Sequence, residues 1–109
     1  MERTLLVPLD GSLLAECALP PARLLAQRMG AHLCLLRAVP ASEQTDAARY
    51  LAGVADRLAE GNVPASWVVR STPAPDAILQ EAMALAPTLE GIVLASHGQS
   101  GLGRWVYGS

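Results

Sequence analysis

The most informative absence in this sequence is lysine, because all eight basic residues of the 109-residue chain are arginine. A Walker A loop, a Schiff-base enzyme and the phosphoryl relay of a receiver domain each require a lysine, so the sequence excludes all three. Phenylalanine is also absent, and aromatic residues make up only 4% of the chain. Because single-stranded nucleic acid is bound by stacked aromatic side chains, this kind of binding surface is excluded too.

The sequence also lacks strong charge and long apolar runs. Its formal net charge is -2, which leaves no electrostatic footprint for nucleic acid or an anionic membrane surface. No run approaches the about 18 consecutive apolar residues of a membrane span, and the N-terminus lacks the basic flank and cleavage site of a signal peptide. We therefore expect a soluble cytoplasmic protein with neither a nucleic-acid partner nor a membrane partner.

Cysteine and histidine are scarce and isolated. Cys17 and Cys34 have neither CxxC nor metal-site spacing, and we expect two reduced thiols packed in the core. His32 and His97 are expected to be exposed polar residues rather than catalysts or metal ligands. No carboxylate pair, activated nucleophile or metal cluster can be assembled from these residues, so we expect a protein that is not an enzyme.

The remaining composition predicts one globular domain over residues 1–109, with 51% hydrophobic and 17% charged residues. Four short apolar runs are typical of strands buried on both faces, and they alternate with three amphipathic segments typical of helices. The runs cover residues 4–9, 32–39, 65–70 and 91–95, and the helices begin near Ser12, near Thr45 or Asp46, and near Thr72.

The first predicted helix has clear boundary signals. The Ser12 hydroxyl can cap its N-terminus, and Gly30 can end it because glycine accepts a positive φ. Pro20 and Pro21 should kink this helix, since neither residue can donate a backbone hydrogen bond.

The alternation of strands and helices predicts the fold class and the position of a site. It specifies a three-layer α/β/α domain in which an open parallel sheet is connected by right-handed crossovers. Ligands bind such sheets beyond the carboxyl ends of the strands, where the strand order reverses. Those ends carry Asp10 and residues 38–39, 70–72 and 95–98.

A glycine-rich stretch after the last predicted strand holds four of the nine glycines and is expected to be a loop. This stretch closely resembles the phosphate-binding signature of the universal stress protein (UspA-like) family. The matching positions are Ala95, then Gly98 after two intervening residues, and then Gly108-Ser109 after nine more. Glycine suits such a loop because backbone amides can then approach phosphate oxygens. The resemblance covers essentially the whole chain and includes Val-Pro-Leu-Asp-Gly-Ser at residues 7–12, Ala-Leu-Pro at 18–20 and Ser-Gly-Leu-Gly-Arg-Trp at 100–105.

The resemblance implies an adenine-nucleotide α-hydrolase-like fold with strand order 3-2-1-4. The family's last helix and fifth strand are then absent from the chain, which would leave residues 91–95 as an open apolar sheet edge. Leu5, Val7, Ile92 or Leu94 would be uncovered on one face, at roughly 1.5–3 kcal/mol for each buried side chain lost. We expect a further segment to cover this edge, and homodimerisation in addition.

The resemblance also implies a function: a nucleotide-binding module for ATP or AMP that acts in the stress response through dimerisation or a conformational change. Mg²⁺ would be held through the phosphates, and ATP hydrolysis would be slow at most. The resemblance assigns the phosphates to Gly98, Gly108 and Ser109, the ribose to Asp10, and the adenine to Pro8, Leu9 and Ala38. The predicted site also includes Val39, Leu94 and Ala95. Arg104 is added as a phosphate contact because of its charge alone.

Two alternatives stay open at the level of sequence. Ala95 stands where the family signature has its first glycine, and its methyl group would crowd a nucleotide. The chain would then hold no cofactor and would be a stress interaction protein of the same fold, with its function in the dimer surface. Asp10 has a second interpretation as a turn residue that accepts a hydrogen bond from the backbone of Ser12.

Overall fold

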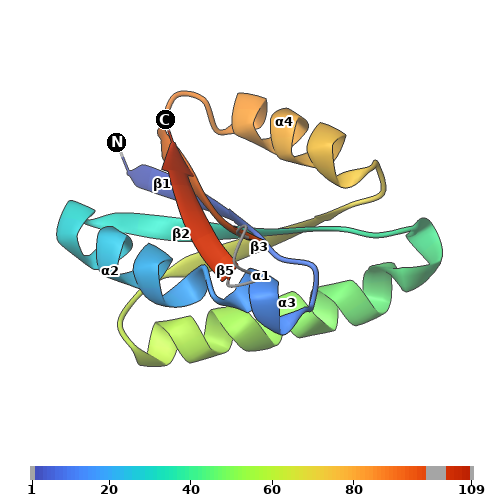
Figure 1. Cartoon of the computed structure of the whole chain (residues 1–109), viewed down its shortest axis with the longest axis horizontal. Coiled ribbons are helices and arrows are strands. Elements are labelled where there is room, and N and C mark those ends of the chain that lie inside the picture. Colours follow the sequence, from blue (N-terminus) through green and yellow to red (C-terminus); the bar gives the residue numbers. More distant parts are fainter. Residues whose placement is uncertain (1, 98–102, 109) are drawn as a thin grey trace.

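The computed structural model describes the backbone of residues 2–97 and 103–108 and the side chains of residues 2–95. Strands and helices alternate along the chain, followed by a strand that the sequence did not predict (Figure 1). The elements are β1 Arg3–Pro8, α1 Leu13–Glu16, α2 Leu19–Met29, β2 Ala31–Ala38, the 3₁₀ turn η1 Ala41–Glu43, α3 Gln44–Glu60, β3 Ala65–Arg70, α4 Ala74–Ala84, β4 Leu89–His97 and β5 Gly103–Gly108.

The strands form a single sheet in the order β3-β2-β1-β4-β5. The β1 strand pairs in parallel with β2 and β4, and β2 pairs in parallel with β3. The α2 and α3 helices pack on one face of this sheet and α4 packs on the other (Figure 1). The predicted three-layer α/β fold with strand order 3-2-1-4 is therefore confirmed.

The sheet divides the core into two clusters of unequal size. Successive strand residues point to opposite faces, so Leu5 and Val7 pack toward α2 and α3, whereas Leu6 packs toward α4. Leu5 and Val7 are fully buried, and the expectation that they are uncovered is wrong because α2 and α3 cover their side of β1. Ile92 and Leu94 are partly buried.

The β5 strand corrects the prediction of a glycine-rich loop and an open edge at residues 91–95. It pairs with β4 in the antiparallel direction, with Gly103 opposite His97 and Gly108 opposite Ile92. The segment between its two glycines is Arg-Trp-Val-Tyr, and β-branched and aromatic residues favour a strand. A chain that turns back on itself can pair antiparallel without a crossover helix, so this edge of β4 is covered from within the chain.

The first predicted helix is two helices in the structure. The Ser12 side chain caps α1 as predicted, because its Oγ accepts a hydrogen bond from the Ala15 backbone N–H at 3.0 Å. Pro20 and Pro21 do not kink a helix but lie in the first turn of α2, where no backbone N–H is needed for a helical hydrogen bond. Gly30 ends α2 with a φ of 67°, as predicted.

The two cysteines differ in exposure, although both thiols are free. Cys34 is buried in β2 as expected, and burial raises the pKa of its thiol. Cys17 is exposed, so its predicted place in the core is wrong. The prediction assumed one continuous helix with an apolar face that includes Cys17. In the structure α1 ends at Glu16, so Cys17 does not lie on such a face.

Candidate functional site

A hollow opens at the carboxyl ends of β1, β2 and β4 and has a volume of about 190 Å³. The chain runs from β1 to β2 and β3 on one side and then crosses to β4 on the other, so this edge is where the strand order reverses. Open α/β sheets bind ligands at such a switch point. The lining residues are Pro8, Leu9, Asp10, Ala15, Leu36, Ala38, Ala74, Ile78, Leu94 and Ala95.

The hollow is largely apolar because the strand ends and the start of α4 contribute mainly apolar side chains to it. Pro8 and Leu36 are partners in the parallel register of β1 and β2, so they lie side by side in the sheet. Ala38 and Ile78 belong to the core cluster between the sheet and α4. The first turns of α4 contribute Ala74 as well, which leaves a wall of small or branched apolar groups. Such a surface suits a flat ring that has little charge.

Asp10 is the one ionisable residue among the described residues that line this hollow. Its Oδ1 accepts a hydrogen bond from the Ser12 backbone N–H at 2.9 Å, which confirms its role as a turn residue. Hydrogen bonding to Ser12 lowers the pKa of Asp10 below its ordinary value of 3.8, with a smaller contribution from the charge of Arg37. The carboxylate is therefore ionised at neutral pH, and it has lone pairs left to accept further hydrogen bonds.

Arg37 supports the Asp10 turn and was not foreseen from the sequence. Gly11 has a φ of 86°, and a Cβ added there would lie 2.9 Å from Arg37 Nη1. On its other side, the guanidinium carbon of Arg37 lies 5.1 Å from the centroid of the Tyr50 ring. The Tyr50 hydroxyl donates a hydrogen bond to Glu16, and burial followed by this bond raises the pKa of Tyr50. The available signal was an arginine within an apolar strand, since a partly buried cation needs such partners.

Arg37 also carries an unsatisfied donor. Its Nε is buried and has no hydrogen-bond partner within the described part of the chain. A buried donor without a partner costs roughly 1–3 kcal/mol, so the sandwich between Gly11 and Tyr50 holds this side chain against a penalty.

The structure brings together six of the residues that the sequence assigned to a nucleotide. Val39 is buried beside them but does not line the hollow, and its backbone N–H donates to the Arg70 carbonyl at 3.0 Å. Gly98 and Ser109 lie outside the described residues. The six in the hollow are Pro8, Leu9, Asp10, Ala38, Leu94 and Ala95.

Gly108 and Arg104 are placed by the antiparallel pairing of β5. Gly108 lies opposite Ile92, which is itself in register with Leu6 of β1. The structure therefore does not place Gly108 at the strand ends, because the chain has returned along β4 by about 3.3 Å for each residue. The backbone of Arg104 lies opposite Ser96, near the carboxyl end of β4.

The described residues hold no group of three or more histidine, cysteine, aspartate or glutamate side chains that could bind a metal ion. The expectation that Mg²⁺ is held through phosphates stays a prediction. Among the helices of the described residues, none has both the length and the apolar character needed to cross a bilayer.

The sheet, the helices on both faces and the hollow at the switch point define an open, three-layer α/β fold. Among solved structures, the chain is similar to a protein of the universal stress protein family from Burkholderia pseudomallei, whose crystal structure superposes with a TM-score of 0.61. The match covers 76% of this chain and 74% of that chain at 24% sequence identity. No protein-family model and no curated protein matches the chain. The chain thus has the fold of that universal stress protein, as the sequence resemblance implied.

Proposed function

We propose that this protein is a UspA-like, cytoplasmic nucleotide-binding module that takes ATP or AMP and acts in the stress response without being an enzyme. The observation that carries the proposal is the hollow at the switch point, where Asp10 and apolar residues of three strands meet. Support for the stress-protein part comes from the fold shared with the Burkholderia protein. Dimerisation or a conformational change on binding would pass the signal on.

The chemistry of the hollow fits the adenosine part of such a nucleotide. Pro8, Ala38 and Ile78 offer apolar contacts to an adenine ring, and no charged group stands among them. The ionised Asp10 carboxylate would accept hydrogen bonds from ribose hydroxyls, as acidic residues do in other nucleotide-binding α/β sheets. Gly98 and Ser109 are the phosphate contacts that the family resemblance implies.

The size of the hollow limits what the described residues can enclose. Ligand pockets usually measure about 300–1,000 Å³, which is more than the volume of this hollow. The hollow is therefore suited to the base and part of the ribose. Phosphates would project beyond it.

The test is calorimetric titration with ATP plus magnesium and with AMP. Ala38→Leu places a larger side chain in the part of the hollow proposed to hold the adenine ring. It should weaken the affinities for ATP and for AMP by about tenfold or more, the equivalent of about 1.4 kcal/mol. Ala84→Leu makes the same change at an exposed position of α4 outside the hollow, and it should leave both affinities unchanged. Equal affinities in the two variants would remove this hollow as the site.

A second candidate function is a stress interaction protein of the same fold that binds no nucleotide. The observation in its favour is Ala95, whose side chain lines the hollow where the family signature has glycine. If the first proposal is right, Ala95→Gly tightens ATP binding and Gly98→Val abolishes it. ATP at 100 times its dissociation constant should then stabilise the protein by about 2.7 kcal/mol, whereas the second candidate predicts no stabilisation at all.

A further inference from the structure

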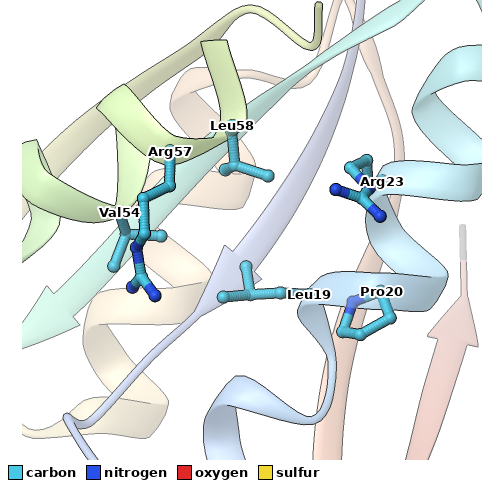
Figure 2. A pocket seen from close by; sticks show the side chains of 6 residues that line it. All are labelled: Leu19, Pro20, Arg23, Val54, Arg57 and Leu58. Atoms are coloured by element: carbon cyan, nitrogen blue, oxygen red, sulfur yellow. The ribbon is translucent and has the colours of Figure 1, made fainter. Parts of the chain in front are cut away.

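A second hollow lies between α2 and α3, and it shares no lining residue with the hollow at the strand ends (Figure 2). Its volume is about 260 Å³. The start of α2 forms one wall and the C-terminal half of α3 forms the other (Figure 2). We call it the α2–α3 groove, and its lining residues are Leu19, Pro20, Arg23, Val54, Arg57 and Leu58.

Two arginines from different helices stand on the two walls of the α2–α3 groove. Figure 2 shows Arg23 on the α2 wall and Arg57 on the α3 wall, with the side chains of Leu19 and Leu58 between them. The α2–α3 groove thus combines an apolar surface with one cation on each wall. It offers contact to hydrocarbon and pairing to an anion in one small space.

The two cations are only weakly neutralised by the protein. Arg23 forms no ion pair with any carboxylate of the described residues. Arg57 has one partner, Glu16, at 3.9 Å between Nη2 and Oε1, and the Arg57 side chain is 63% exposed. That carboxylate also accepts the hydrogen bond from Tyr50, so it is shared. The groove is therefore locally positive in a chain whose net charge is -2.

We propose that the α2–α3 groove binds a small carboxylate with a compact apolar body, of the class of aromatic acids. A guanidinium group pairs with a carboxylate through parallel N–H···O bonds, and the groove offers one guanidinium group from each wall. Leu19, Val54 and Leu58 then take the apolar body out of water. The volume, near the lower limit of about 300 Å³ for ligand pockets, selects a ligand of one ring. This site is independent of the nucleotide proposal.

The test is titration of the full chain with benzoate, followed by calorimetry and by the backbone amide shifts of the groove residues. We expect saturable binding, with shifts at Arg23 and Arg57 and none at Asp10. Benzyl alcohol has the same ring without the charge, and it should bind about tenfold or more weakly because charge-assisted hydrogen bonds are lost. Equal binding of benzoate and benzyl alcohol, or no benzoate binding at all, would overturn the proposal.

Matched variants separate this groove from any exposed arginine. The double variant Arg23→Gln/Arg57→Gln should weaken benzoate binding by about tenfold or more. The double variant Arg28→Gln/Arg49→Gln makes the same change at exposed positions of α2 and α3 outside the groove, and it should bind benzoate like the wild type. All four positions are exposed, so both variants should fold, and circular dichroism checks this. An equal loss in both variants would show that benzoate binds to arginines without using the groove.

Discussion

Gly11 is the residue on which the geometry of the Asp10 turn depends most. Its φ of 86° is one that residues with a side chain rarely adopt, and a Cβ added there would lie 2.9 Å from Arg37 Nη1 and displace the guanidinium group. Gly11→Ala should therefore lower the free energy of unfolding by about 2 kcal/mol, through backbone strain and displacement of Arg37.

Gly53 provides the matched control, because it lies inside α3 and a Cβ added there meets nothing within 4 Å. Gly53→Ala should raise the free energy of unfolding by about 1 kcal/mol, since alanine is the better helix former. Urea unfolding of both variants measures the difference. The same sign of change in the two variants would contradict the account of Gly11.

Asp10 makes a prediction about pH. Its pKa in the folded state is lowered by the hydrogen bonds from Ser12, so the folded protein binds this proton less readily than the unfolded chain does. The stability that Asp10 contributes is thus fully present above its ordinary pKa of 3.8 and is lost as the pH falls through the lower, folded-state pKa. Asp10→Asn should be less stable than wild type at neutral pH, with the gap closing in acid. Urea unfolding over a pH series checks this, and a gap that is constant with pH would refute it.

At the scale of elements, an ion pair joins the end of β3 to α4. Arg70 donates to Glu81 Oε1 from Nε at 3.0 Å and from Nη2 at 2.8 Å, and Glu81 is only 8% exposed. Arg70→Met leaves the Glu81 carboxylate buried without its partner and should cost about 2 kcal/mol, a value reduced for the partial exposure of Arg70.

The double variant Arg70→Met/Glu81→Met removes both charges and should recover part of that loss. Urea unfolding of Arg70→Met, of Glu81→Met and of the double variant gives the coupling energy of the pair. Strictly additive losses would mean that the pair contributes no coupling between β3 and α4.

The elements also show which parts of this fold could be predicted from local sequence. The apolar run at residues 65–70 coincides with β3, and Ser12 and Gly30 mark helix ends where predicted, because these signals act over a few residues. The kink predicted at Pro20 and Pro21 is wrong, since a proline pair fits the start of a helix as well as a kink. The β5 strand was missed because its stability depends on pairing with β4, which no local pattern records.

At the scale of the whole molecule, topology was the better guide to the site. The rule that ligands bind at the carboxyl ends of parallel strands placed Asp10, Ala38 and Ala95 at one edge, and all three line the hollow there. Gly108 was assigned by resemblance to a motif, and the antiparallel β5 strand instead carries it back along the sheet. Arg37 was missed because its contacts with Gly11 and Tyr50 depend on the packing of three separate elements.

The most direct test of the central claim is the change in backbone amide chemical shifts of ¹⁵N-labelled protein during a titration with AMP. The hollow at the carboxyl ends of β1, β2 and β4 should respond as the nucleotide site. We therefore predict saturable shifts of the amides of Leu9, Asp10, Ala38 and Ala95, with unchanged amides in the α2–α3 groove. Shifts confined to other parts of the chain, or none at saturating AMP, would contradict the claim that this hollow binds an adenine nucleotide.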